Sequence, residues 1–201
     1  MLITQAQARG FSIIVVTGAL AMIGLVTMAA WPLVQDHSRR AALSADRALA
    51  LSEAERALDA AECEIAIATG TPPRRGCAGV RDAARAAALN PITLAGFRPG
   101  QCGDALCSPL TGQTAQGLSD LLTTADKARA VPAALAETWR EPAQPARYVI
   151  EPLPDALPGE WAQAGTARAP SLFRITAVGF GLTEKVTVML QSVYRPQADE
   201  P

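Results

Sequence analysis

An uncharged apolar run dominates the N-terminal end of this chain. It extends from Gly10 to Trp31 and is followed by Pro32. About 20 apolar residues are needed for a helix to cross the ~30 Å hydrocarbon core of a bilayer. A single segment in lipid must satisfy its own backbone polar groups, so it has to be helical. The run therefore predicts a membrane-spanning helix.

Three interpretations of this segment compete. As a removable secretory signal its apolar region is too long, and Met28 fits the small-residue cleavage rule poorly. An ordinary signal anchor is the second interpretation. The third rests on the junction Ala8-Arg9-Gly10-Phe11, where a polar leader ends in glycine and an aromatic residue opens the apolar run. This junction resembles the cleavage site of type IV prepilins and type II secretion pseudopilins. The resemblance implies that a prepilin peptidase cuts between Gly10 and Phe11 and methylates the new N-terminus.

Helical sequence continues after the apolar run. Residues at steps of three and four predict one apolar face, which consists of Leu51, Ala54, Leu58, Ala61, Ile65 and Ala68. Charged residues, Glu64 among them, lie on other faces. Gly70 and the Pro72-Pro73 pair are expected to end the helix. We expect one helix from about Phe11 to about Ala68, kinked or loosened at Pro32.

The rest of the sequence, residues 70–201, is expected to form a globular head. Residues 80–89, 118–125 and 133–139 are candidate short helices, and Trp139 is expected to be a packing anchor. A strand is expected at 148–150, and alternating patterns at 172–178 and 186–194 predict an antiparallel hairpin that turns at Gly179-Phe180-Gly181. A helix laid across one face of an antiparallel sheet is an α+β fold.

Two further segments resemble PilX-type minor pilins of the type IV pilus. They are the alanine-rich stretch 48–62 and the C-terminal segments 173–177 and 188–195. The resemblance implies the pilin lollipop, with a leader at 1–10, a transmembrane and filament-core helix at 11–32, its amphipathic half at 33–69, and a globular head after residue 69. It is thin across residues 71–143.

The cysteines predict disulfide bonds. All four follow the membrane segment, and they are Cys63, Cys77, Cys102 and Cys107. An even number on the exported side of a membrane favours disulfides over free thiols. Four cysteines permit three pairings, of which we prefer the local one, Cys63 with Cys77 and Cys102 with Cys107.

Nothing in the sequence favours catalysis. His37 is the only histidine and follows the membrane segment directly, and no phosphate loop, zinc-protease motif or nucleophile elbow is present. The spacing of Asp104, Asp120 and Asp126 matches no calcium loop. The 18 basic and 19 acidic residues form no basic patch with interleaved aromatics. We therefore expect no catalytic residues, cofactor or metal, and no nucleic-acid partner.

One departure from the pilin pattern bears on mechanism. Most pilins carry a glutamate at the fifth residue after the cut, which is thought to neutralise the N-terminal ammonium of a neighbouring subunit. Here that position is Val15. The resemblance then implies a minor pilin at or near the pilus tip that helps to prime assembly.

The same resemblance implies partners and locations. The partners are other minor pilins, the major pilin, the prepilin peptidase, the inner-membrane assembly platform and a PilY-type tip adhesin, with the loop 96–107 a candidate contact. The location is the inner membrane, with the head in the periplasm, and then the fibre. Two alternatives remain open, which are a minor pseudopilin of type II secretion, and a membrane-anchored periplasmic enzyme or binding protein. Roles in adhesion, twitching motility or DNA uptake are not distinguished.

Overall fold

A computed structural model describes residues 11–72, 77, 82–108, 114–124, 126–132, 141–153 and 172–196. Their contacts divide the chain into two units, the first ending at Ala45 and the second beginning at Asp46. The expected helix at 133–139, with Trp139, lies outside the described residues, as does the leader up to Gly10.

Helix α1 extends from Phe11 to Thr69 and contains Pro32 without a break in its helical assignment. It ends where the sequence predicts, because Gly70 adopts a positive φ of 78° and Pro72 follows. A left-handed glycine just after the last turn is a common way to end a helix. The long helix of the expected α+β fold is thus confirmed.

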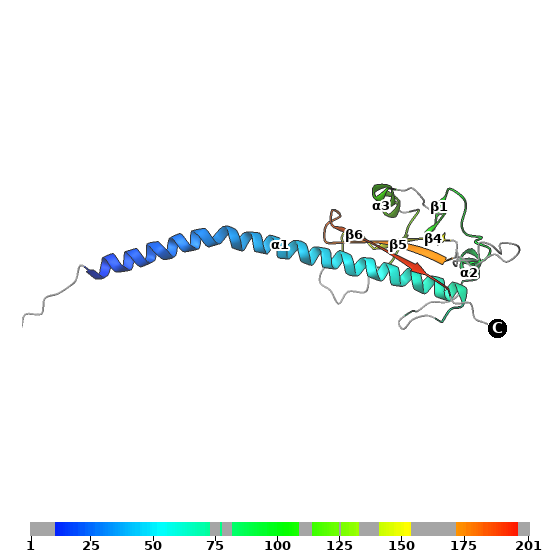
Figure 1. Cartoon of the computed structure of the whole chain (residues 1–201), viewed down its shortest axis with the longest axis horizontal. Coiled ribbons are helices and arrows are strands. Elements are labelled where there is room, and N and C mark those ends of the chain that lie inside the picture. The colour runs from blue at the N-terminus through cyan, green and yellow to red at the C-terminus, as the bar shows by residue number, and fades with distance from the viewer. Residues whose placement is uncertain are drawn as a thin grey trace, which may run out of the picture. The chain divides into compact units, whose positions relative to one another are not determined.

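The second unit adds two short helices and the strands of the head (Figure 1). The helices are α2 (Ala83–Ala88) and α3 (Ala115–Thr123). The strands are β1 (Cys102–Gly103), β2 (Leu106–Cys107), β3 (Arg129–Ala130), β4 (Arg147–Leu153), β5 (Leu172–Phe180) and β6 (Thr187–Tyr194).

These strands form one sheet among the described residues, in the order β1-β2-β4-β5-β6, with β3 also paired to β4. The pairs β4–β5 and β5–β6 are antiparallel, which confirms the C-terminal hairpin. The sheet is nevertheless mixed, because β2 runs parallel to β4. The sequence analysis did not anticipate β1, β2 or β3, because two-residue strands are too short to show alternation.

The hairpin turn differs from the expected one. Gly179 and Phe180 belong to β5, where they pair with Val188 and Thr187, and the turn starts at Gly181. Gly179 is a packing glycine: a Cβ built on it would overlap the carbonyl oxygen of Ala50 and the backbone nitrogen of Ala54 in α1. Helix and strand backbones therefore meet directly at this point.

Each face of the sheet is covered by a helix (Figure 1). The C-terminal part of α1 covers one face, with Ala57, Ala61 and Ile65 packed against residues such as Phe173 and Ile175. Helix α3 covers the other face, where its Leu122 is fully buried. The head therefore has a core on both sides of β4 and β5.

The buried stripe of α1 agrees with the expected one at Ala54, Ala61, Ile65 and Ala68 and differs from it at Leu51. Ala50, Ala54 and Ala57 are fully buried, but Leu51 is 40% exposed. The expectation that Leu51 faces the core was wrong, because the close approach at Gly179 leaves room for alanine methyl groups and not for a leucine side chain.

Candidate functional site

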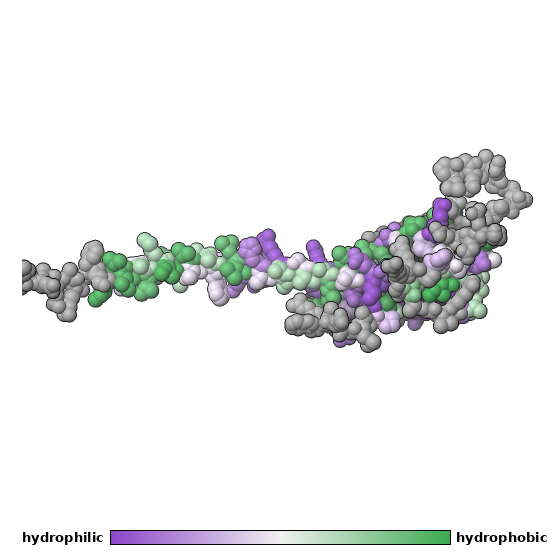
Figure 2. Space-filling view, turned by 90° about the horizontal axis from the view of Figure 1, so that it is seen from below, coloured by the Kyte–Doolittle hydropathy of each residue, from purple (hydrophilic) through white to green (hydrophobic). Residues whose placement is uncertain are grey.

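The part of α1 before Asp46 is an exposed apolar surface. Its large apolar side chains are more than half exposed, with Val15 at 53% and Met28 at 78%. Figure 2 shows the N-terminal part of this stretch as a largely green surface, followed by a hydrophilic patch before the head. Among the described residues, α1 is the one helix long and apolar enough to cross a membrane.

Two threonine hydroxyls within this stretch are satisfied inside the helix. The hydroxyl of Thr17 donates to the carbonyl oxygen of Ile13 at 2.9 Å, and that of Thr27 to Ile23 at 3.0 Å. Such bonds let a hydroxyl enter an apolar medium at little cost. Beyond the apolar run, Asp36 and Arg40 form an i,i+4 ion pair at 2.8 Å. His37 lies beside them and is exposed.

The processing position falls at the edge of the described chain. Phe11 is the first residue of α1, and the structure describes its backbone. Val15 lies one turn further on, and the next acidic residue in the sequence is Asp36. No carboxylate of this chain therefore lies near the start of the helix within the described residues.

The C-terminal end of α1 carries a charged cluster in the head. We name it the Glu64 cluster, and it consists of Glu64, Arg85, Asp104, Arg129 and Tyr148. Glu64 Oε1 accepts hydrogen bonds from Arg85 Nε and, at 2.9 Å, from Arg129 Nη1. Tyr148 donates its hydroxyl to Glu64 Oε2. One carboxylate from the helix thus ties together α2, β3 and β4.

Asp104 extends the cluster to the β1–β2 hairpin. Arg85 Nη1 donates both to the carbonyl oxygen and to the Oδ2 of Asp104, each at 3.1 Å. Asp104 and Ala105 form the hairpin turn, with φ values of 48° and 63°. Positive φ is unfavourable for alanine, so the contacts around the turn hold it in place.

Electrostatics of the cluster favour the charged form of Arg129 and the neutral form of Tyr148. Burial, the charge of Glu64 and the hydrogen bond to it raise the pKa of Tyr148 well above its usual range. Burial lowers the pKa of Arg129, but electrostatic interactions with Glu64, Tyr148 and Asp104 together outweigh that effect and raise the pKa overall. Arg129 therefore stays charged and Tyr148 stays neutral through the physiological range.

The cysteines form two disulfides. The structure joins Cys63 at the end of α1 to Cys77, with Cα atoms 5.5 Å apart, and joins Cys102 to Cys107, with Cα atoms 4.1 Å apart. This is the local pairing. Cys102 and Cys107 are also cross-strand partners in the β1–β2 hairpin, so the bond closes that hairpin.

The sequence analysis missed the Glu64 cluster. It placed Glu64 on a charged face away from the core, yet the side chain is only 15% exposed. Its partners come from segments 21 to 84 residues further along the chain. Nothing in the local pattern around Glu64 distinguishes it from the exposed Glu55 or Asp59. Of the three aspartates weighed for calcium, Asp104 pairs with Arg85, while Asp120 lies on α3 and Asp126 in the turn before β3.

A family comparison agrees with this architecture. The model of the type IV pilus assembly protein PilX, C-terminal part, matches residues 83–196, which is more than half of the chain. The chain belongs to the PilX family. The match covers α2, α3 and every described strand, and so it includes the Arg85, Asp104, Arg129 and Tyr148 of the cluster.

Membership in the PilX family makes this chain a pilin related to the type IV pilus. An apolar N-terminal helix in such a protein fits anchoring in a membrane and incorporation into a pilus. No curated protein and no solved structure matches the chain.

Proposed function

We propose that this protein is a minor pilin, processed between Gly10 and Phe11, that acts at or near the pilus tip and primes assembly. Its partners in this role are the other minor pilins, the major pilin, the prepilin peptidase and the assembly platform of the inner membrane. A PilY-type adhesin is a further partner at the tip. The role is structural and involves no catalytic step by this chain.

One observation carries the tip position. From Phe11 to Gln35 the chain has no acidic residue, and Val15 occupies the position at which most pilins have glutamate. An unpaired charge at membrane depth costs at least ~2.5–3.5 kcal/mol on insertion scales. A subunit with valine here cannot supply the carboxylate that neutralises another subunit's N-terminal ammonium. It is least costly at the end of the fibre, where no further subunit requires that carboxylate.

The apolar surface of α1 supports storage followed by assembly. In the membrane it contacts lipid, and in a fibre it would contact the helices of other subunits. Gly18 and Gly24 have open space around a built Cβ in the isolated chain, and small residues allow helices to approach closely within a membrane. The head would lie in the periplasm before assembly.

The decisive experiment is N-terminal mass analysis of the mature protein. A chain that begins with methylated Phe11 supports processing by a prepilin peptidase. A chain cut after residue 29 or 30, or an uncut chain in intact pili, would overturn the proposal. In a second experiment the subunit is labelled in isolated fibres, and a label distributed evenly along the fibre would count against the tip position.

A further inference from the structure

Strand β6 forms one edge of the sheet. It pairs with β5 on one side, and no element among the described residues pairs with its other side. The strand has eight residues, and its register with β5 continues from Thr187 to Tyr194 without a bulge. It contains no charged residue and no proline. Proteins usually protect an edge strand by making it short, charged, bulged or interrupted by proline, so β6 lacks these protections.

The main-chain groups on the outer side of β6 belong to alternate residues. The backbone nitrogen of Gly181 donates to the carbonyl oxygen of Val186 at 2.8 Å, which fixes one hydrogen-bonded pair at the start of the hairpin. In an antiparallel pair, hydrogen-bonded pairs recur at every second residue. Counting from that pair along the register of β5 and β6, the N–H and C=O groups that point away from β5 are those of Met189, Gln191 and Val193.

One flank of α1 lies beside β6 (Figure 1). Ser192 Oγ of β6 donates to Glu62 Oε1 at 3.2 Å, so the side of α1 that carries Glu62 borders this strand. Residues three and four apart on a helix are surface neighbours, which places Asp59 and then Glu55 before Glu62 along the same flank. Both are exposed. We name Glu55, Asp59 and Glu62 the acidic flank.

The acidic flank has no basic residue of α1 beside it. Between Leu51 and Thr69 the helix has a single basic residue, Arg56. Its guanidinium donates to Glu53 and to the carbonyl oxygen of Pro132, and so it is held on another side of the helix. An uncharged strand edge therefore lies next to a negatively charged strip of helix.

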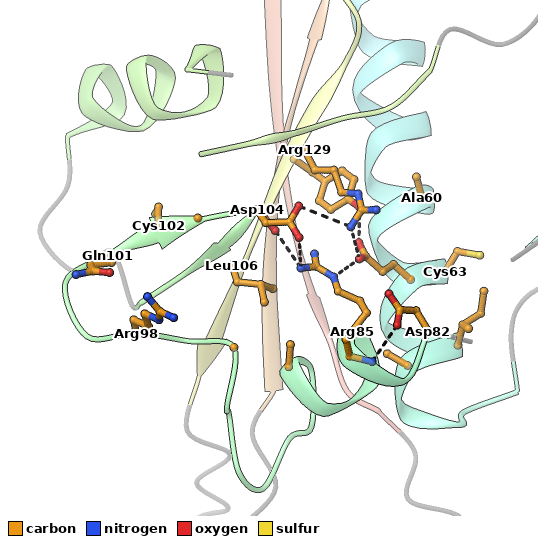
Figure 3. Close-up of a pocket in the computed structure, with 18 residues that line it drawn as sticks. Ala60, Cys63, Asp82, Arg85, Arg98, Gln101, Cys102, Asp104, Leu106 and Arg129 are labelled. Atoms are coloured by element: carbon orange, nitrogen blue, oxygen red, sulfur yellow. Dashed lines mark hydrogen bonds and ion pairs between the residues drawn. The ribbon is translucent and has the colours of Figure 1, made fainter. Parts of the chain in front are cut away.

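The opposite flank of α1 has balanced charges. There Glu64 pairs with Arg85 and Arg129, and Asp104 pairs with Arg85. This side also contains a pocket of about 810 Å³, which is lined by three arginines and three carboxylate residues (Figure 3). The acidic flank beside β6 differs because the helix supplies it with no counter-charge.

A second copy of this chain does not suit the open edge. If two copies paired antiparallel through β6, a twofold axis perpendicular to one continuous sheet would relate them. Both α1 helices would then lie on the same face of that sheet, with their acidic flanks toward each other across the junction. Such a juxtaposition of like charges disfavours the pairing, and a basic partner would instead be attracted.

We propose that β6 accepts an added antiparallel strand from a partner protein, and that this strand carries Lys or Arg at alternate positions. Met189 packs on the α3 side of the sheet, so partner side chains opposite Met189, Gln191 and Val193 lie on that side. The intervening side chains lie on the α1 side, where basic groups approach the acidic flank. Apolar groups at the other positions lie beside Val193, which is 58% exposed. In this mode of recognition main-chain hydrogen bonds give affinity and alternate side chains give specificity.

The test is titration of the full chain in detergent micelles with fluorescent peptides, followed by anisotropy. The parent probe is Thr-Lys-Val-Lys-Val-Lys-Thr, blocked at both ends, and its charge control has glutamate in place of every lysine. Saturable binding is expected for the parent, and binding at least about tenfold weaker for the control, a factor that corresponds to ~1.4 kcal/mol.

Two isomeric probes test the main-chain pairing. One carries N-methyl groups on both valines, and the other carries them on the first two lysines. In the proposed register the valine N–H groups point at β6 and the lysine N–H groups point away from it. Methylation at valine is expected to weaken binding at least about tenfold, and methylation at lysine should leave the affinity unchanged. Composition and charge are the same in both isomers.

Two pairs of variants test the protein side. Gln191→Pro removes an N–H that β5 does not use, at an edge where proline is tolerated. Gln191→Ala is its control, because it also loses the side-chain bond to Thr176 but keeps that N–H. Glu55→Lys should weaken binding of the lysine peptide and strengthen binding of the glutamate peptide. Asp120→Lys makes the same charge change on α3, on the other face of the sheet, and should alter neither.

The outcomes separate strand addition from its alternatives. Equal affinity of the two N-methylated isomers, or no saturable binding of the parent peptide, overturns the proposal without relying on any variant. Tighter binding of the glutamate peptide, or unchanged affinities in Glu55→Lys, overturns the basic partner. A dimer of the full chain that forms in Gln191→Ala and not in Gln191→Pro would assign the edge to a second copy instead. Failure here would leave the proposed pilus role unaffected, because that role depends on the N-terminal part of α1.

Discussion

Gly179 of β5 lies against the backbone of α1 so closely that a side chain on it would overlap the carbonyl oxygen of Ala50. This contact sets the distance between helix and sheet on the α1 face of the head. It also explains why alanines, and not leucines, form the buried stripe of the helix at this level.

Substituting Gly179 tests that relationship. Gly179→Ala is expected to destabilise the head by about 3 kcal/mol or more, because neither backbone can move without disturbing the core. Thermal unfolding of the full chain in micelles, followed by circular dichroism, measures the change. Gly103→Ala is the matched control, since a Cβ there meets nothing within 4 Å. Equal melting temperatures for the two variants would contradict the close contact.

Neutralising Glu64 should destabilise the head. Glu64→Gln leaves Arg85 and Arg129 without their shared counter-charge and is expected to cost about 1.5–3 kcal/mol, the range for hydrogen bonds to charged groups. Glu55→Gln, on an exposed face of the same helix, should change stability by less than about 0.5 kcal/mol. Denaturant titration of both variants measures the difference. A loss in Glu64→Gln no larger than that of the control would show that the cluster contributes nothing to stability.

Tyr148 makes stability depend on alkaline pH. Its folded pKa is raised, so the stability associated with the neutral phenol is present below the ordinary tyrosine pKa of about 10 and is lost as pH rises above it. We expect the melting temperature of the wild type to fall more steeply above pH 10 than that of Tyr148→Phe. Absorbance at 295 nm should show no ionisation of Tyr148 before unfolding. Parallel pH profiles for the two proteins would contradict the shift.

The two disulfides should be separable by their effect on stability. Loop-closure entropy predicts about 2 kcal/mol for the short loop of Cys102–Cys107 and about 3 kcal/mol for that of Cys63–Cys77. Double alanine variants of each pair, measured by denaturant titration, test these values. Peptide mapping without reduction tests the pairing itself, and a peptide that links Cys63 to Cys102 or Cys107 would disprove it.

The sequence predicts the regular parts of this fold well. The end of α1 at Gly70, the short helix before Asn90 and the C-terminal hairpin all follow from local signals, namely helix formers, stop residues and alternation. Each of these signals lies within a few residues of the structure that it predicts. The PilX resemblance at both ends of the chain agrees with the family match.

The parts that sequence reasoning missed depend on distant contacts. The local sequence predicts that Gly179 is a turn residue and that Leu51 is a core residue. Both predictions fail because they do not include the packing of α1 against β5. The local sequence predicts that Glu64 is a solvated carboxylate. In the structure it accepts hydrogen bonds from Arg85, Arg129 and Tyr148, which lie on three other elements. The pocket depends on the same tertiary placement, so no local motif could indicate it.

Asp46 has a mechanical consequence. Its Oδ1 accepts a hydrogen bond from the backbone nitrogen of Leu182 in the β5–β6 turn, at the point where α1 enters the second unit. Traction along the helix axis from the N-terminal side reaches this bond before any buried alanine of the stripe. A pulling force applied to the N-terminal side of α1 would therefore act first on the hydrogen bond of Asp46, which is only 8% exposed.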